Sequence, residues 1–209
     1  MPVIPTIEMQ EGIIPITCMM NEWLADGAQM IQIYEDVAKL SLIAFTSKRD
    51  GSLELDSLGA GSWTNPMIHR ILSWRPMIPI ESRDTMIQEV FRLGLLLYMA
   101  PIWRWFGVAP VLTTKLVQNL VIFLDSNVID WPPGSWRIKL WAVYMGACEA
   151  LDSSHEAWYC NQIMLILRER EMESWSLAVD HVYNFLWAEP VFAKRDSRLS
   201  TLIGILMRR

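Results

Sequence analysis

The sequence is poor in cysteine and in charged residues. Its three cysteines, Cys18, Cys148 and Cys160, are an odd number spread over 209 residues, which is not the pattern of a disulfide framework. We expect them to be buried free thiols in a reducing compartment. Charged residues make up 20% of the chain and hydrophobic residues 52%, and this balance excludes a disordered, highly charged tail.

An excess of positive charge is also missing. The formal net charge is −5, so the chain as a whole is not expected to bind a nucleic-acid backbone. Basic residues gather only modestly towards the C-terminus, at Lys194, Arg195, Arg198, Arg208 and Arg209, and a role of this tail in nuclear import or phosphate contact stays an alternative. Residues 1–16 hold two acids, three prolines and no basic segment, so they do not resemble a secretory signal peptide.

No apolar run is long enough to suggest a transmembrane helix. The uncharged stretch 93–103 has eleven residues, well short of the ~20 that cross a bilayer as a helix. The second candidate, 108–124, carries Lys115 in its middle. We therefore expect both stretches to be core helices of a soluble protein that does not bind a membrane.

Catalytic and metal-binding motifs are missing as well. His69, His155 and His181 do not form a His-x-x-x-His pair, which would place two imidazoles on one helix face. There is no Gly-x-Ser-x-Gly nucleophile motif, and the glycine-rich segment 59–62 lacks the lysine of a phosphate loop. We assign no catalytic, cofactor-binding or metal-ligating residue and expect no cofactor. The question of enzymatic activity stays open, with a non-enzymatic role favoured.

What the sequence does have is helical periodicity along nearly its whole length. Apolar residues recur at three- and four-residue steps, and no run alternates as a strand would. The sequence predicts an all-α fold, a single helical domain of about seven or eight packed helices. We place this domain at 17–209, after an N-terminal extension at 1–16. Residues 47–64 hold three glycines and four serines, which predicts a mobile loop.

Capping residues and prolines indicate where the helices begin and end. Asn65-Pro66 and the capping box of Thr85 with Gln88 are expected to begin helices. Pro101 is expected to end or kink its helix, and Pro190 to end its helix. The predicted helical ranges are 18–45, 65–74, 85–99, 111–125, 135–151, 153–169, 174–189 and 197–207.

Tryptophan is unusually abundant, with eleven residues. Tryptophans fill gaps between crossing helices, or they line an aromatic pocket for a flat or hydrophobic ligand. We favour the filled core and keep the pocket as the alternative, in which a cation such as Arg104 could stack on an indole ring. The candidate pocket residues are Trp103, Arg104, Trp141, Glu149, Asp180 and His181.

Three segments, in this order, resemble a known family. They are EVFRLGLLLYM at 89–99, WRIKLWAVYMGA at 136–147, and Ser174-Trp175 leading to Phe185-Leu186-Trp187. Over 18–207 the chain resembles the fungal-specific transcription factor domain, the all-helical C-terminal regulatory region of fungal Zn2Cys6 zinc-cluster transcription factors. The resemblance implies transcription regulation in the nucleus, in control of metabolic or secondary-metabolism genes.

The sequence departs from that family in one respect. The family reads DNA through an N-terminal cluster of six cysteines that binds two zinc ions, and the three cysteines here lie too far apart to form it. We therefore expect a regulatory domain without its own DNA-binding module and no direct sequence-specific DNA binding. Its partners would be other proteins (the transcription machinery or a full-length regulator), a small hydrophobic ligand, or a second copy in a homodimer.

A second interpretation belongs to a different functional class. The chain could be a repurposed helical small-molecule-binding or accessory biosynthetic protein with a tryptophan-lined cavity, located in the cytoplasm rather than the nucleus. A closed cavity dotted with polar groups of perturbed pKa would favour this interpretation. A filled core would favour the regulatory domain.

Overall fold

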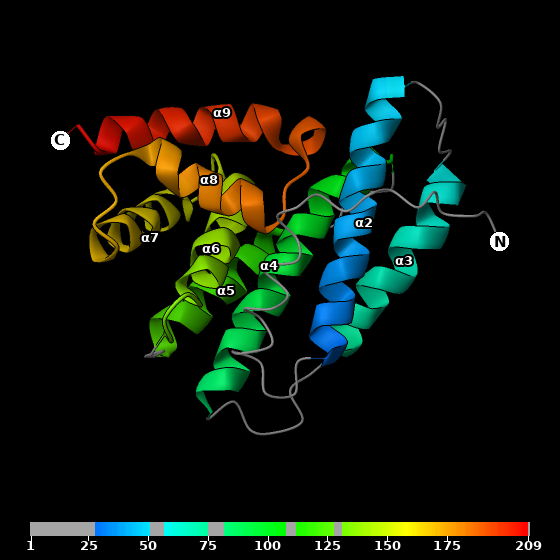
Figure 1. Ribbon diagram of the computed structural model, residues 1–209, viewed down its shortest axis with the longest axis horizontal. Coiled ribbons are helices and arrows are strands. Elements are labelled where there is room, and N and C mark those ends of the chain that lie inside the picture. The colour runs from blue at the N-terminus through cyan, green and yellow to red at the C-terminus, as the bar shows by residue number, and fades with distance from the viewer. Residues whose placement is uncertain (1–27, 51–56, 75–81, 108–111, 128–130, 209) are drawn as a thin grey trace.

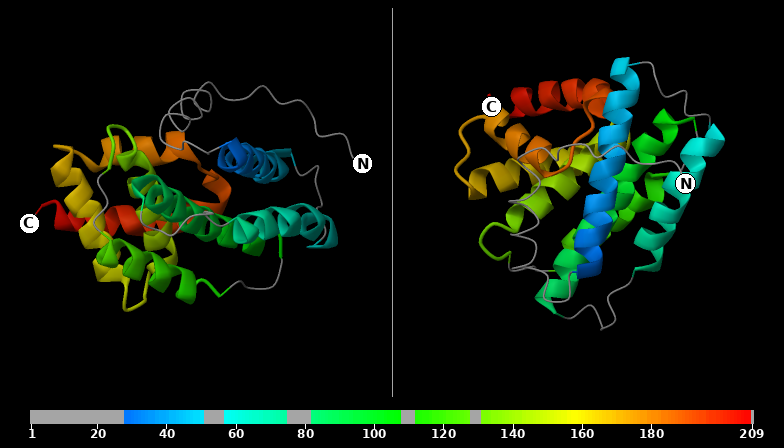
Figure 2. Two further views of the ribbon diagram at one scale, coloured as in Figure 1. Left: turned by 90° about the horizontal axis from the view of Figure 1, so that it is seen from below. Right: turned by 45° about the vertical axis from the view of Figure 1, so that its right-hand side comes forward.

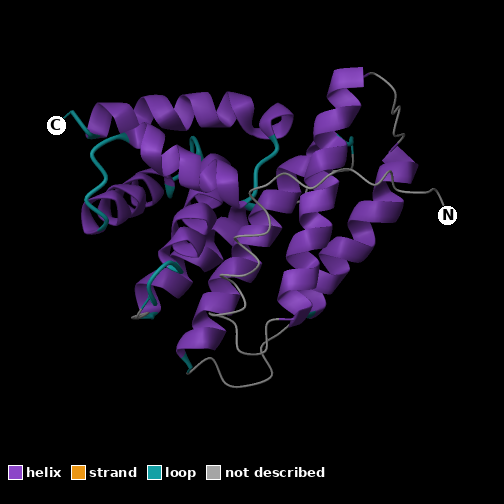
Figure 3. Ribbon diagram, viewed as in Figure 1, coloured by secondary structure: helices purple, strands orange, loops and turns teal. Residues whose placement is uncertain are grey.

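The computed structural model describes residues 28–50, 57–74, 82–107, 112–127 and 131–208. All regular secondary structure in these ranges is helical, which confirms the predicted all-α single domain (Figures 1 and 3). The helices are α2 (Ala28–Asp50), α3 (Ser57–Ser73), α4 (Arg83–Trp105), α5 (Thr114–Ser126), α6 (Trp136–Ala150), α7 (Glu156–Glu169), α8 (Trp175–Phe185) and α9 (Glu189–Leu206).

Two central helices organise the fold. α4 and α6 share the most extensive contact of any helix pair in the described chain, and α6 also packs against α5, α7, α8 and α9. α2 and α3, blue and cyan, gather at one end of the molecule, whereas α7 and α8 lie at the other (Figures 1 and 2). α9 packs against α2, α4, α6, α7 and α8, so the last helix ties the two ends together.

The central position of α4 and α6 follows from their composition. Every residue from 140 to 148 is buried, and so is every residue from 93 to 102. A helix that is apolar on all sides is stable only when other elements surround it. The flanking helices are apolar on one stripe only: in α8 the buried residues are Ala178, Val179, Val182 and Phe185.

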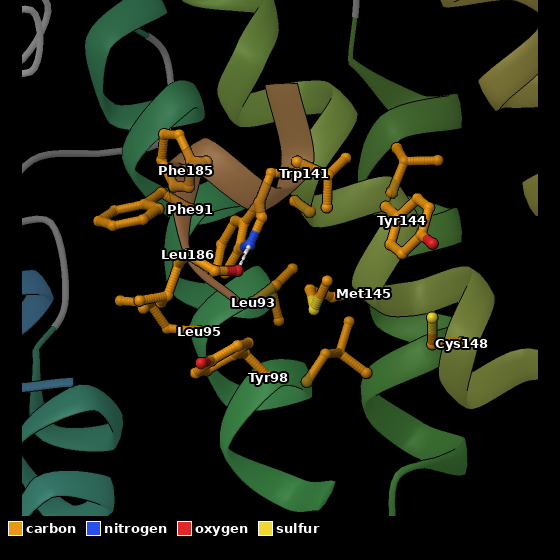
Figure 4. Packing of buried hydrophobic residues seen from close by; sticks show 14 of the residues in the cluster. Phe91, Leu93, Leu95, Tyr98, Trp141, Tyr144, Met145, Cys148, Phe185 and Leu186 are labelled. Atoms are coloured by element: carbon orange, nitrogen blue, oxygen red, sulfur yellow. Dashed lines mark hydrogen bonds between the residues drawn. The ribbon is translucent and has the colours of Figure 1, made fainter. Parts of the chain in front are cut away.

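The three segments that carry the family resemblance meet at one place in the core. The ring of Trp141 on α6 lies 5.8 Å from that of Phe91 on α4 and 5.0 Å from that of Phe185 on α8, measured between ring centroids. The indole Nε1 of Trp141 donates a hydrogen bond of 3.0 Å to the carbonyl oxygen of Leu186 (Figure 4). The hydroxyl of Tyr34 on α2 donates to the neighbouring carbonyl of Phe185. Together these bonds satisfy two carbonyls at the end of α8 that the helix itself leaves free.

Two glycines allow the central helices to approach closely. A Cβ atom added to Gly94 would lie 2.6 Å from Cζ3 of Trp141, and one added to Gly146 would lie 2.2 Å from Cε1 of Tyr159. Both distances are shorter than any normal carbon contact. The aromatic rings therefore occupy the space that a side chain at either glycine would need.

The predicted loop at 47–64 is wrong at both ends. α2 continues to Asp50 and α3 begins at Ser57, while residues 51–56 lie outside the described part of the chain. Pro66, expected to begin a helix, lies inside α3. The glycines and the proline weaken the helix locally, by about 1–3 kcal/mol per residue, but burial of Met67 and Ile71 against the core outweighs this penalty.

Two predictions about prolines are also corrected. Pro101 does not end a helix, because it lies inside α4, which continues to Trp105 with the next residue, Ile102, fully buried. Pro190 occupies the first turn of α9 rather than ending the helix before it. In that position the missing N–H costs nothing, because the first amides of a helix have no partner within it. The last helix is therefore Glu189–Leu206 and not 197–207.

One predicted N-cap is confirmed, and one predicted helix start is corrected. The hydroxyl of Ser174 accepts a hydrogen bond from the amide of Leu177, as expected for the N-cap of α8. α4 begins earlier than predicted, because Ser82 is its N-cap and accepts a 3.2 Å hydrogen bond from the amide of Thr85. The predicted extension at 1–16 and the first turns of the predicted helix 18–45 lie outside the described residues. Within the described ranges, no helix is both long enough and apolar enough to cross a membrane.

Candidate functional site

A cleft of about 690 Å³ opens where the last turns of α4 and α6 meet α9. Its apolar lining comes from Pro101, Trp105, Leu151 and Val191. Its charged lining comes from Arg104 on α4, Glu149 on α6, Asp152 just after α6, and Lys194, Arg195 and Arg198 on α9. Both kinds of surface face the same space, so the cleft can hold a molecule that is charged at one end and apolar at the other.

A buried carboxylate holds two arginines side by side at this cleft. The side chain of Glu149 is 2% exposed, and its Oε1 atom accepts hydrogen bonds from Arg104 Nη2 at 2.5 Å and from Arg195 Nη1 at 2.6 Å. A carboxylate this deeply buried is stable only when it is paired, because desolvation of an isolated charge is expensive. Glu149 lies near the negative end of the α6 dipole, and the arginines also offset that unfavourable position.

A second ion pair lies beside the first. The guanidinium of Arg198 forms two hydrogen bonds with the carboxylate of Asp152, one of them 2.5 Å between Nη1 and Oδ2. These bonds lower the pKa of the Asp152 carboxyl and raise the pKa of Arg198. Asp152 has a left-handed backbone with φ 65°, which aspartate tolerates better than most residues. The turn after α6 thus presents the carboxylate to α9.

The charges around the cleft do not cancel. Four cations, Arg104, Lys194, Arg195 and Arg198, face two carboxylates in the lining, and a third, that of Glu156, lies 4.0 Å from Arg198. With Glu156 included, the formal charge is +1 in a chain of net charge −5. Lys194 forms no ion pair with any residue in the described ranges. The cleft is therefore a positive site on an otherwise acidic protein, and the electrostatic field there attracts anions.

The structure brings together two of the six predicted pocket residues. Arg104 and Glu149 form the ion pair described above. Trp141 is fully buried in the core and does not line the cleft. Trp103, half-buried on α4, is also not part of the cleft lining.

Asp180 and His181 belong to a different part of the surface. Asp180 is exposed on α8, and the ring of His181 packs edge-on against Trp136, with 4.9 Å between centroids. Arg137 and Arg170 both lie over the same indole ring, at 5.7 and 5.5 Å from its centroid. Burial, together with the charge of Arg137, lowers the pKa of His181, and Asp180 offsets part of this shift.

Sequence reasoning did not connect four of the cleft residues with the site. Asp152, Lys194, Arg195 and Arg198 line the cleft, whereas the sequence predicts for the last three only a modestly basic tail, with nuclear import or phosphate contact as its alternative role. With Pro190 predicted to end a helix and the last helix predicted at 197–207, residues 194–198 do not fall on one predicted helix. The spacing of 194, 195 and 198 was the available signal, since residues three and four apart share a helix face.

Two thiols and the potential metal ligands of the described chain complete the description of its reactive groups. Cys148 and Cys160 are free and buried, as expected for these two, whereas Cys18 lies outside the described residues. Burial raises the pKa of the Cys148 thiol, which holds it in the protonated, weakly nucleophilic form. No group of three or more potential metal ligands occurs among the described residues.

Comparison with known proteins adds no family to this description. Neither a protein-family model, nor a curated protein, nor a solved structure matches the chain. The chemistry of the site therefore follows from its own side chains. They provide a cluster of preorganised guanidinium groups, one unpaired ammonium group and a small apolar wall.

Proposed function

We propose that this chain is a helical regulatory domain of the fungal transcription-factor type, without a DNA-binding module of its own. It would act in the nucleus by binding partner proteins or a small inducer, in control of metabolic or secondary-metabolism genes. Its protein partners would be the transcription machinery or a full-length regulator.

One observation carries this proposal: the three resembling segments meet in a single cluster. Phe91, Trp141 and Phe185 lie more than forty positions apart along the chain, and their rings lie 5.0–6.0 Å apart between centroids. Hydrophobic motifs that recur in a fixed order make physical sense when they build one shared core. The packing supports the proposal that the three segments resemble the family because together they form one core.

The second interpretation, a protein with a tryptophan-lined cavity, has less support. Trp141 is enclosed by other side chains, and the cleft that does exist is open at the surface and mainly charged. Trp105 is its one tryptophan among the described lining residues. An accessory small-molecule-binding protein stays the alternative, now with the charged cleft in place of an aromatic cavity.

A transcription reporter tests the proposal. The full chain would be fused to an unrelated DNA-binding module and expressed in a fungal cell that carries the matching operator upstream of a reporter gene. We expect reporter output to change several-fold relative to the DNA-binding module alone. The core variant Trp141→Ala, expressed at the same level, should lose the effect. An output equal to that of the module alone would overturn the regulatory assignment.

The purified chain provides a second test. We expect no sequence-dependent retention of DNA, because the chain is acidic overall and phosphate contacts dominate DNA affinity. A mobility shift that depends on DNA sequence and survives added salt would contradict the absence of a DNA-binding module.

A further inference from the structure

We infer that the cleft between α4, α6 and α9 is a binding site for a small organic anion, a carboxylate or phosphate ester with a compact apolar body. The inference rests on the proposed function in one respect, since it gives the chemical class of the inducer. The acid group would bind Arg104, Arg195, Arg198 and Lys194. The apolar body would lie on Trp105 and Val191.

The arginines have hydrogen-bonding capacity to spare. The Glu149 carboxylate uses one nitrogen of Arg104 and one of Arg195, whereas a guanidinium carries several further N–H donors in a planar fork. Both side chains are partly exposed, at 28% and 35%, and both line the cleft. Their remaining donors are accessible to a ligand, and carboxylate or phosphate oxygens match the geometry of a guanidinium.

The buried carboxylate prepares the site before a ligand arrives. Because Glu149 holds two guanidinium groups on the same oxygen atom, their side-chain entropy is already lost in the free protein. Binding to a preorganised site costs less than ordering two free arginines. One carboxylate also leaves the pair with excess positive charge, and a bound anion would reduce the repulsion between them.

The size and lining of the cleft favour an organic anion over an inorganic one. A volume of about 690 Å³ is in the usual range for sites that bind drug-sized molecules and is much larger than a phosphate ion. Trp105 is 40% exposed and lines the cleft together with Val191. An apolar group placed on this wall would bury surface that the free protein leaves in water.

Calorimetric titration of the full chain with a matched set of probes tests the inference. The anionic probes are 1-naphthyl phosphate and 1-naphthoate; the controls are neutral 1-naphthol and inorganic phosphate. We expect at least one anionic naphthyl probe to bind with a dissociation constant below about 1 mM. Each control should bind at least about tenfold more weakly, since 1-naphthol lacks the anionic group and inorganic phosphate lacks the apolar ring. Affinity should fall with added salt.

Cleft variants locate the binding site. Arg195→Gln should weaken the anionic probe about tenfold or more, because a charge-assisted hydrogen bond is lost. Arg195 also pairs with Glu149, so Lys194→Gln provides a second test in which no described ion pair is broken. We expect Lys194→Gln to weaken binding several-fold with unchanged stability. The matched control is Arg168→Gln, an exposed arginine of α7 outside the cleft lining, and it should bind like the wild type.

Four results would overturn the inference. These are failure of both anionic naphthyl probes to bind, equal binding of 1-naphthol or inorganic phosphate, wild-type affinity in both cleft variants, and much tighter binding of a Glu-rich peptide than of either probe. The last result would assign the cleft to an acidic segment of a partner protein. The reporter assay and the titration test the two proposals separately. Loss of regulation together with intact anion binding would overturn the proposed function but not the anion site.

Discussion

The middle of the central helix pair and its C-terminal end differ in the side chains that they contribute. In their middle, α4 and α6 contribute Tyr98 and Trp141 to a filled aromatic core (Figure 4). In their last turns the same helices contribute Arg104 and Glu149 to an open, charged cleft. Stability is thus concentrated along the middle of the pair, and binding chemistry where the helices end and α9 crosses them. We therefore expect a substitution in the core to lower stability, and a substitution in the cleft to affect mainly binding.

The largest expected effect is in the core. Trp141→Ala removes a fully buried indole and leaves the Leu186 carbonyl without its hydrogen-bond donor. We expect a loss of about 4 kcal/mol in the free energy of unfolding, as for other large-to-small changes of buried aromatic residues. Urea titration measures this loss. Lys194→Gln in the cleft should change stability by less than about 0.5 kcal/mol; equal midpoints for the two variants would break the comparison.

The core could largely be predicted from the sequence, because its signal is local. Apolar residues at helical spacing predicted that the tryptophans fill a core. Among the described residues Trp141 is the one fully buried tryptophan, and six others are partly buried against the core: Trp74, Trp131, Trp136, Trp158, Trp175 and Trp187. The Ser174 cap was readable from neighbouring residues alone. The cleft was less accessible. Arg104 and Glu149 were both named as candidates, but Arg195 joins them across 46 residues only because α9 crosses the ends of α4 and α6. α9 begins at Glu189, with Pro190 in its first turn. A proline can end one helix or begin the next, and the tertiary structure decides between the two.

A second core prediction concerns overpacking. Gly146→Ala places a methyl group where the buried ring of Tyr159 lies, so the ring or the backbone of α6 must shift. We expect a net loss of about 2 kcal/mol despite the better helix propensity of alanine. Gly204→Ala in α9 is the matched control, because a Cβ atom there meets nothing within 4 Å. It should be neutral or stabilise the protein by up to about 1 kcal/mol, and a loss equal to that of Gly146→Ala would contradict the close approach.

The cleft contributes to stability through one residue. Glu149→Gln removes the charge that holds Arg104 and Arg195 together. We expect a loss of about 2 kcal/mol, below the ~3–5 kcal/mol of a fully buried pair, because both arginines are partly exposed to water. Denaturant titrations at low and high salt measure the change. A variant as stable as the wild type at low salt would show that the carboxylate only positions the arginines.

The smallest expected effect is a pH dependence away from both regions. Burial against Trp136 and the charge of Arg137 lower the pKa of His181 in the folded protein, so the unfolded chain takes up the proton first. The contribution of His181 to stability is complete above its unfolded pKa of about 6.5 and is lost as the pH falls through the lowered folded value.

Urea midpoints in neutral and mildly acidic buffer measure this contribution. The difference between the two buffers should be smaller in His181→Gln than in the wild type. His69→Gln is the control, because His69 is exposed and its one hydrogen bond within the described ranges is to Ser73 on its own helix. A wild-type pH difference in His181→Gln would show that other groups cause the dependence.

The hydrogen bond from Tyr34 to the carbonyl of Phe185 has a consequence for synthesis of the protein. Its two residues are 151 positions apart, and α2 also packs against α9. At ~5–20 residues per second, the ribosome would need roughly 8–30 s to deliver the partner of α2. Contacts of α2 with α3 and α4 can form earlier, but Tyr34, fully buried in the finished fold, would lack its partner at the end of α8 during that time. The packing of α2 is thus completed only after α8 and α9 have been synthesised.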